Sequence, residues 1–124
     1  KLHWAFRMSE RKRRGDYGER LALQYLAAQG YRLLDQNWRY GHKELDLVLR
    51  QGDTVVFAEV KARASAAYGT PGEAVTARKK GNLLVAAQAY LLQHSLTDAP
   101  ARFDVLEVDL RTGAVRQIEN AFGQ

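Results

Sequence analysis

The sequence of 124 residues contains no cysteine, only two prolines and no long apolar run. Without cysteine, neither a disulfide framework nor a thiolate metal site can form, and nothing indicates an oxidising compartment. The longest apolar stretch, residues 83–92, is well short of the roughly 20 residues that span a bilayer. The opening residues also lack the h-region of a signal peptide. We therefore expect a cytoplasmic protein without a membrane anchor.

The formal net charge of +5 originates in the first 14 residues. They carry six basic side chains and one acidic side chain, whereas the rest of the chain holds 13 of each. The basic run consists of Arg11, Lys12, Arg13 and Arg14. Such a run can bind the phosphates of a nucleic acid, and a solvated tail that aids solubility is an equally good interpretation. We expect residues 1–14 to be a basic arm or leader and residues 15–124 to be one domain.

Apolar periodicity predicts two helices and five strands. The first helix covers residues 16–30, where Asp16 and Glu19 form a capping box and Gly30 supplies the stop. On this helix Glu19 is in line with the apolar stripe, which is an unusual place for a carboxylate. The remaining elements are strands at 31–40, 44–50 and 54–62, a helix at about 70–94, and strands at 102–110 and 114–119.

The order of these elements is αβββαββ, which indicates an α/β fold with a mixed central sheet flanked by helices. The strands at 44–50 and 54–62 are joined by a short turn and should form an antiparallel hairpin. The second of these strands is almost continuously apolar over residues 55–58, so it should be a central strand covered on both faces. The start signal of the second helix consists of Thr70, Pro71 and Glu73.

Four charged side chains occur on this hairpin, Glu44 and Asp46 on its first strand and Glu59 and Lys61 on its second. Residues two apart in a strand face the same side, so each pair should share a face. If the register sets Asp46 beside Glu59, two or three carboxylates lie within a few ångströms of each other, with a lysine alongside. Their repulsion is costly unless a cation or a proton intervenes.

Carboxylate oxygens in a chain without cysteine suit Mg²⁺ or Mn²⁺, which bind one or two carboxylates together with water and substrate phosphate. Beside such an ion, Lys61 could orient or help deprotonate a water and stabilise charge on a phosphoryl group, while the ion acts as a Lewis acid. The implied reaction is phosphodiester hydrolysis. The alternative is an ordinary solvated strand face, on which Glu and Lys form cross-strand ion pairs.

Five segments together carry a family resemblance. They are "GE" at 18–19, "ELD" at 44–46, "FAEVKAR" at 57–63, "TPGEAV" at 70–75 and "RFDVLEV" at 102–108. In the order and spacing of these segments, from about Arg14 to Phe122, the chain resembles the YraN family of small bacterial proteins. That family is similar to the PD-(D/E)XK nucleases, so the resemblance implies a restriction-endonuclease-like core with a layout similar to archaeal Holliday-junction resolvases.

The resemblance also implies roles for individual side chains. Asp46 and Glu59 would be the ligands of Mg²⁺ or Mn²⁺, Lys61 would be the catalytic lysine, and Glu19 would be a further carboxylate at or next to the metal. The proline that precedes the first acid in the superfamily is replaced here by Leu45.

Two acidic residues have structural alternatives to a role at the metal. Glu44 is either a third ligand on the face of Asp46 or the partner of Lys43 or Arg63 in an ion pair at the strand end. Glu19 is either a ligand or only the last member of the capping box. Both stay candidates for the metal site.

Basic residues outside the arm could contact a phosphate backbone. They are Arg63, Arg78, Lys79 and Lys80. A solvated helix face is the ordinary alternative for the last three. Trp38, Tyr40 and Tyr68 could stack on bases, although aromatic residues in strands more often pack in the core.

The sequence therefore predicts a metal-dependent endonuclease that acts on DNA, with branched or otherwise non-B DNA as a candidate substrate that is read through phosphates and shape. A homodimer is expected only by analogy with resolvases, which must cut two strands. Two alternatives use the same residues. One is a nuclease-fold module that binds nucleic acid but hydrolyses little, and the other is an adaptor that binds a protein or anionic partner through the basic arm.

Overall fold

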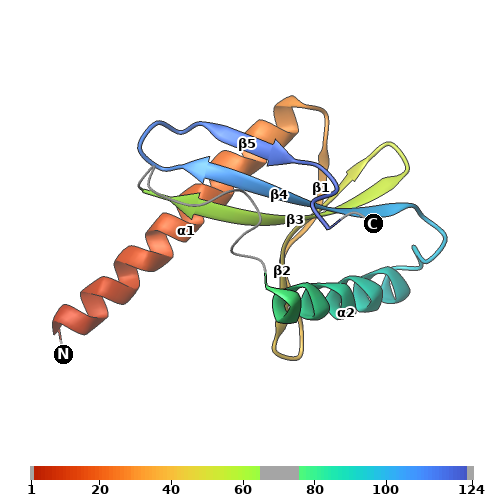
Figure 1. Cartoon of the computed structure of the whole chain (residues 1–124), viewed down its shortest axis with the longest axis horizontal. Coiled ribbons are helices and arrows are strands. Elements are labelled where there is room, and N and C mark those ends of the chain that lie inside the picture. The colour runs from red at the N-terminus through yellow and green to blue at the C-terminus, as the bar shows by residue number, and fades with distance from the viewer. Residues whose placement is uncertain (1, 65–75, 123–124) are drawn as a thin grey trace.

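Two helices enclose a five-stranded mixed sheet in the computed structural model, which describes residues 2–64 and 76–122, with side chains from residue 15 onward (Figure 1). The elements are α1 (Leu2–Ala28), β1 (Arg32–Tyr40), β2 (Lys43–Gln51), β3 (Thr54–Arg63), α2 (Ala77–Gln93), β4 (Ala101–Asp109) and β5 (Val115–Ile118). The predicted order αβββαββ is confirmed, and it is compatible with a restriction-endonuclease-like core.

The first helix begins much earlier than the sequence indicated. The capping box at Asp16 and Glu19 predicted a start at residue 16, but α1 is continuous from Leu2, so this prediction is wrong. Arg, Lys and Glu are good helix formers, and the single Gly15 costs only about 1 kcal/mol relative to alanine. The first turns of α1 extend away from the sheet (Figure 1). The assignment of residues 1–14 as a phosphate-binding arm stays a prediction.

The strands lie in the order β1-β2-β3-β4-β5, so each strand pairs with its neighbour in the sequence. β1, β2 and β3 pair antiparallel, β3 and β4 pair parallel, and β4 and β5 pair antiparallel. A parallel pair needs a crossover connection, and α2 lies within it. Residues 55–58 of β3 are buried, which confirms the prediction of a central strand covered on both faces.

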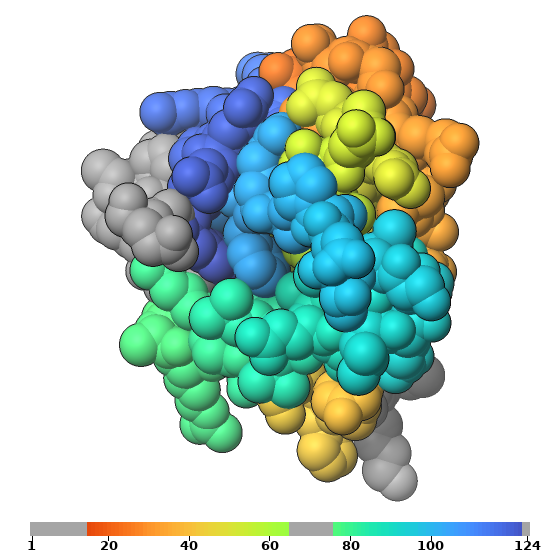
Figure 2. Space-filling model, turned by 90° about the vertical axis from the view of Figure 1, so that its right-hand side faces the viewer, coloured from red at the N-terminus to blue at the C-terminus, as the bar shows by residue number. Residues whose placement is uncertain are grey.

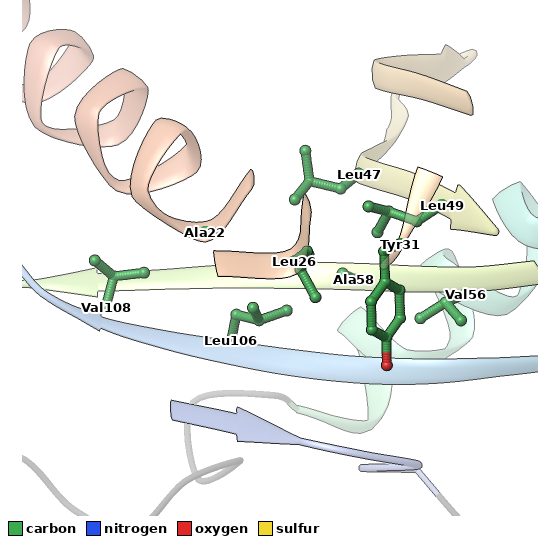
Figure 3. Close-up of a cluster of buried hydrophobic side chains, with 9 residues drawn as sticks. All are labelled: Ala22, Leu26, Tyr31, Leu47, Leu49, Val56, Ala58, Leu106 and Val108. Carbon is green, nitrogen blue, oxygen red and sulfur yellow. The ribbon is translucent and has the colours of Figure 1, made fainter. Parts of the chain in front are cut away.

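Each face of the sheet has its own apolar core. The core on the α1 side consists of Ala22, Leu26, Tyr31, Leu47, Leu49, Val56, Ala58, Leu106 and Val108 (Figure 3). The core on the α2 side consists of Leu45, Val48, Val55, Phe57, Leu83, Ala86, Ala87 and Tyr90. Figure 2 shows the side of the molecule on which α2 lies across the strands. Successive residues of β3 alternate between the two cores, so this strand presents side chains to both helices.

The helix α1 approaches β3 closely at Gly18. A Cβ atom at this position would lie 2.6 Å from the Cβ atom of Ala62, a separation that two such atoms do not adopt. The missing side chain therefore lets α1 lie against the C-terminal half of β3. This contact fixes where the next residue of α1, Glu19, lies above the sheet.

The second helix begins at Ala77, with Thr76 as its N-cap. The Oγ1 atom of Thr76 accepts a hydrogen bond from the Lys79 backbone N–H at 3.1 Å, and this bond orders the first turn. The predicted start signal at Thr70, Pro71 and Glu73 lies outside the described residues. In the part of the chain that the structure describes, no helix combines the length and the apolar character needed to cross a membrane.

Candidate functional site

The candidate site lies where β2 and β3 separate. Their described pairing runs from Gln51 and Thr54 to Leu47 and Ala58. Continued by one position, this register would place Asp46 opposite Glu59, which is the arrangement on which the argument from the sequence depended. The Asp46 carboxylate takes the place of a main-chain acceptor here, because its Oδ2 accepts a hydrogen bond from the Val60 N–H at 3.0 Å. Asp46 is therefore tied directly to the strand that carries Glu59 and Lys61.

The regular alternation of β2 breaks at Asp46. Leu45 belongs to the core on the α2 side and Leu47 to the core on the α1 side, although residues two apart in a regular strand share a face. On the neighbouring strand, Asn37 lies between Gln36 and Trp38, which pair with Leu47 and Leu45, and it has a positive φ of 53°. The irregularity therefore affects both strands at the same level of the sheet.

Because of this irregularity, strand alternation does not place Glu44 with Asp46 as the sequence argument assumed. Glu44 is paired across the strands with Arg39, and the distance from Arg39 Nη2 to Glu44 Oε2 is 3.7 Å. The alternative of an ion pair at the strand end is the arrangement found, with Arg39 as a partner that the sequence had not indicated. A role of Glu44 as a metal ligand stays a prediction.

Glu59 is the most buried member of the site. Only 5% of this residue is exposed, and its side chain lies on the α2 side of β3, together with Phe57 and Lys61. Its Oε2 atom lies 3.9 Å from Lys61 Nζ and 2.8 Å from Lys79 Nζ. A carboxylate at this depth needs charged or hydrogen-bonding partners, and here two lysines from β3 and α2 supply them.

Asp46 carries the clearest electrostatic signature of the site. Its pKa is raised from 3.8 to about 8, mainly by burial and then by the negative charge of Glu59. A hydrogen bond with Glu59 and the charge of Glu19 raise this pKa further, against the opposing effect of the Val60 N–H. In the absence of a cation, the protein therefore keeps a proton on Asp46 at neutral pH.

Lys79 is part of the same electrostatic system. Burial alone would lower its pKa, but the hydrogen bond with Glu59 and the charges of Glu59, Asp46 and Glu44 outweigh burial and raise the pKa. Lys79 therefore stays protonated. The sequence had grouped Lys79 with Arg78 and Lys80 as a phosphate contact. The structure places its ammonium group beside Glu59, and a contact of Lys79 with DNA stays a prediction.

Glu19 lies next to the site but is held by other partners. Its Oε1 atom accepts hydrogen bonds from Gln36 Nε2 at 3.1 Å and from Asn37 Nδ2 at 3.3 Å. These amides belong to β1, so Glu19 joins α1 to the strand beside Asp46. The capping-box alternative is wrong because Glu19 lies inside α1. Its influence on the Asp46 pKa shows that it belongs to the same acidic environment.

A divalent cation fits Asp46 and Glu59 through the chemistry of these two donors. They offer hard carboxylate oxygens, and a cation between them would relieve the repulsion that now retains a proton on Asp46. Within residues 15–64 and 76–122, no three His, Asp or Glu side chains are grouped closely enough to hold an ion. An ion bound by Asp46 and Glu59 would draw further ligands from water and substrate, as Mg²⁺ commonly does.

The basic residues proposed for phosphate binding are distributed around the site. Arg78 and Lys80 are exposed on the first turn of α2, and Lys80 Nζ lies 5.5 Å from the centre of the Phe122 ring. Arg63 is half-buried at the end of β3. The side chains of residues 11–14 lie outside the described part of the structure. Contacts of all these residues with DNA stay predictions.

Trp38 of β1 follows the packing alternative, whereas Tyr40 is exposed and its role in base stacking stays a prediction. Trp38 meets Tyr90 edge to face at 5.1 Å between ring centres and stacks in parallel with Tyr40 at 6.4 Å. Tyr40 is the more exposed of the two strand residues. Tyr68 lies outside the described residues, so its role as a base-stacking residue stays a prediction.

A second polar cluster, which sequence reasoning missed, surrounds Asp104. This carboxylate is 1% exposed and accepts hydrogen bonds from Arg102 Nε at 3.0 Å, Gln117 Nε2 at 2.9 Å and the Asn120 N–H at 2.9 Å. It joins β4 to β5 and to the turn that follows β5. The aspartate in the apolar strand segment "RFDVLEV" was the available signal, since a buried carboxylate requires such partners.

Comparisons with known proteins agree with the resemblance to YraN. The uncharacterised protein family UPF0102 matches residues 18–108, a range that includes Glu19, Asp46, Glu59, Lys61 and Lys79. The chain is 36% identical over 111 residues to the UPF0102 protein of Clostridioides difficile, with 90% of this chain and 97% of that protein covered.

Other relatives are similar over comparable lengths. The chain is 43% identical over 114 residues to the UPF0102 protein of Symbiobacterium thermophilum, with 90% of this chain and 97% of that protein covered. It is 47% identical over 103 residues to the UPF0102 protein of Beutenbergia cavernae, with 82% of this chain and 87% of that protein covered. With such identity along most of its length, the chain belongs to the uncharacterised protein family UPF0102, the YraN family.

Proposed function

We propose that this protein is a metal-dependent endonuclease that hydrolyses phosphodiester bonds in DNA. The observation that carries the proposal is the convergence of Asp46, Glu59 and Lys61 at the point where β2 and β3 separate. The buried Glu59 and the half-buried Asp46, which retain a proton between them and lie beside a lysine, form a suitable donor set for Mg²⁺ or Mn²⁺. The proposal also draws on the resemblance to the PD-(D/E)XK nucleases.

Asp46, Glu59 and Lys61 would have different roles in this reaction. Asp46 and Glu59 would hold the ion, and the Val60 N–H keeps the Asp46 carboxylate directed toward β3. When bound, a divalent ion would polarise a phosphoryl oxygen and lower the pKa of a bound water. Lys61 is only loosely engaged at 3.9 Å from Glu59, so its ammonium group could orient the attacking water or stabilise the negative charge that grows on the phosphoryl group.

A DNA substrate is supported by the reaction class and by the distribution of basic groups. Arg78 and Lys80 are exposed on the turn of α2 that carries Lys79, so a phosphate backbone at the site would pass beside cations. The resemblance implies a layout similar to junction resolvases, which makes branched DNA the first substrate to compare with linear duplex. A homodimer that cuts two strands is part of the same proposal.

Cleavage of branched and linear DNA with Mg²⁺ or Mn²⁺ tests the proposal. Asp46→Asn, Glu59→Gln and Lys61→Met should each lower the cleavage rate by about 100-fold or more, because each removes a ligand or a charge from the site. Asp53→Asn, in the exposed turn between β2 and β3, is the matched control and should cut like the wild type. Equal cutting by all variants would point to a contaminating nuclease and refute the proposal.

One observation favours a second candidate, a nuclease-fold module that binds nucleic acid but hydrolyses little. Glu59 already has a short ion pair with Lys79, so the acidic pair has a structural use without a metal. For such a module, DNA binding would weaken steeply with salt but survive Asp46→Asn and Lys61→Met. Absence of cleavage, combined with intact binding in both variants, would decide in its favour.

A further inference from the structure

The candidate site already contains an internal cation from a different element. Lys79 Nζ lies 2.8 Å from Glu59 Oε2, whereas Lys61 Nζ lies 3.9 Å from the same oxygen. Lys79 therefore makes the tighter contact, although Lys61 is the lysine of the strand motif. The hydrogen bond from the Lys79 backbone to the Thr76 cap fixes the start of α2 and keeps this side chain within reach of Glu59.

Burial determines which partner of this ion pair can move. The side chain of Glu59 is 6% exposed on the central strand, whereas that of Lys79 is 43% exposed on the first turn of α2. A long lysine side chain at the surface can turn its ammonium group into water without any change of the backbone. Glu59 cannot do so, because it is enclosed between the sheet and α2. A change in the charge of the site would therefore move Lys79.

A divalent cation and the Lys79 ammonium group compete for the same carboxylate oxygen. Mg²⁺ binds such oxygens at about 2.1 Å, so an ion on Glu59 would lie within a few ångströms of the present Lys79 position. Positive charges at that separation repel each other strongly in a partly buried site. Asp46 and Glu59 together carry at most two negative charges, which one divalent ion would neutralise without help from Lys79.

We propose that Lys79 is a displaceable counter-ion of the candidate metal site. In the metal-free protein its ammonium group neutralises Glu59, and it leaves Glu59 when a divalent cation is bound by Asp46 and Glu59. The released side chain then lies beside Arg78 and Lys80, where it can contact a substrate phosphate. This role rests on the proposed function, and it makes Lys79 a positioning residue that links metal binding to the phosphate contact.

Titration of the metal-free full chain with Mn²⁺, followed by electron paramagnetic resonance of the free ion, tests the proposal. Lys79→Gln should bind Mn²⁺ at least about tenfold more tightly than the wild type, because no ammonium group has to be displaced. Arg78→Gln is the matched control, since it removes one positive charge from the same turn, and its affinity should change by less than about threefold. Lys79→Arg, which keeps the charge, should stay close to the wild type.

The outcomes separate this proposal from the proposed function. If the wild type binds Mn²⁺, Glu59→Gln does not, and Lys79→Gln binds no more tightly than the wild type, then the displacement is refuted and the metal site stands. If the wild type binds no Mn²⁺, both are refuted. A purely structural ion pair would lower the thermal stability of Lys79→Gln without tightening Mn²⁺ binding, and that result would also overturn the proposal.

A second measurement needs no substitution. In nitrogen NMR spectra of the lysine ammonium groups of the wild type, the Lys79 signal should be protected from solvent exchange in the metal-free protein. Saturating Mg²⁺ should remove that protection and leave the Lys80 signal unchanged. A Lys79 signal that keeps its protection at saturating Mg²⁺ would contradict the displacement.

Discussion

The raised pKa of Asp46 predicts that the metal-free protein loses stability as the pH rises. The carboxyl group has a pKa of about 8 in the folded protein, against 3.8 for an exposed aspartate. Between these values the folded state keeps a proton that the unfolded state releases. The free energy of unfolding therefore falls with rising pH, and the stabilisation that Asp46 provides below about pH 4 is lost as the pH passes through about 8.

The size of this effect follows from linkage. Each unit of pH within this window lowers the free energy of unfolding by about 1.4 kcal/mol, so the interval from about pH 5 to pH 8 corresponds to about 4 kcal/mol. Asp46 is partly exposed, and solvent screening reduces the expected change to about 2 to 4 kcal/mol. That is a large part of the roughly 5 to 15 kcal/mol that holds a domain folded.

The substitution Asp46→Asn isolates this contribution. The amide cannot ionise, but its oxygen can still accept the Val60 N–H and its nitrogen can donate to Glu59. Urea denaturation in the presence of a chelator, at several values between about pH 5 and pH 8, would give the free energy of unfolding of both proteins. As the pH rises over this range, the free energy of unfolding of Asp46→Asn should increase by about 2 to 4 kcal/mol relative to that of the wild type.

Two further measurements make the test specific. Asp53→Asn, in an exposed turn, should track the wild type at every pH. Excess Mg²⁺ should restore the stability of the wild type near pH 8 but have little effect on Asp46→Asn, because the ion replaces the proton between the carboxylates. A difference between wild type and Asp46→Asn that stays constant within about 0.5 kcal/mol would refute the reasoning, since Asp46 would then not retain a proton.

Three other substitutions test the packing that supports the site. Gly18→Ala should lower the free energy of unfolding by about 1 to 2 kcal/mol, because the clash of the new Cβ with Ala62 exceeds the gain in helix propensity. In urea denaturation, the double variant with Ala62→Gly should recover most of this loss. If the losses of the two substitutions add, the contact between the two residues is contradicted. Asp104→Ala should lower the free energy of unfolding by about 3 to 5 kcal/mol, because it leaves buried partners of the carboxylate unpaired. Calorimetry of the protein that stays folded should show unchanged Mn²⁺ binding. Tyr90→Phe should lower the free energy of unfolding by about 1 kcal/mol, because it removes the hydrogen bond from the Tyr90 hydroxyl to Asp35 Oδ2 at 2.9 Å. If thermal unfolding shows no loss of stability, this bond contributes nothing.

The order of the elements and the meeting of Asp46 with Glu59 could be predicted because both depend on local signals. A short turn between two apolar strands fixes the register of a hairpin, and that register decides which side chains become neighbours. The partner of Lys79 could not be predicted in the same way, since it depends on where the crossover from β3 sets the first turn of α2. A partial signal existed, because at about 100° per residue Lys79 is in line with Leu83 and Tyr90, which are buried.

The placement of Glu44 on the face of Asp46 rested on an assumption that the structure does not meet. It assumed a regular strand, and the sequence shows no sign of the irregularity at Asp46 and Asn37 that places Leu45 and Leu47 in opposite cores. The early start of α1 was missed because a capping box is only a local preference. A helix continues through such a box when the residues before it also favour the helix.

The interruption between β2 and β3 explains why a site can exist at this place in the sheet. If the hairpin ladder continued past Leu47 and Ala58, the Val60 N–H would need a main-chain acceptor, and Asp46 would be free to face water. Because the ladder stops, the Asp46 carboxylate accepts the hydrogen bond from the Val60 N–H instead. This one bond gives the backbone N–H its partner and holds the acid in a half-buried position. That bond holds Asp46 beside Glu59 against the repulsion between the two carboxylates. A proton, a lysine or a metal ion relieves this repulsion, so the site favours binding one of them.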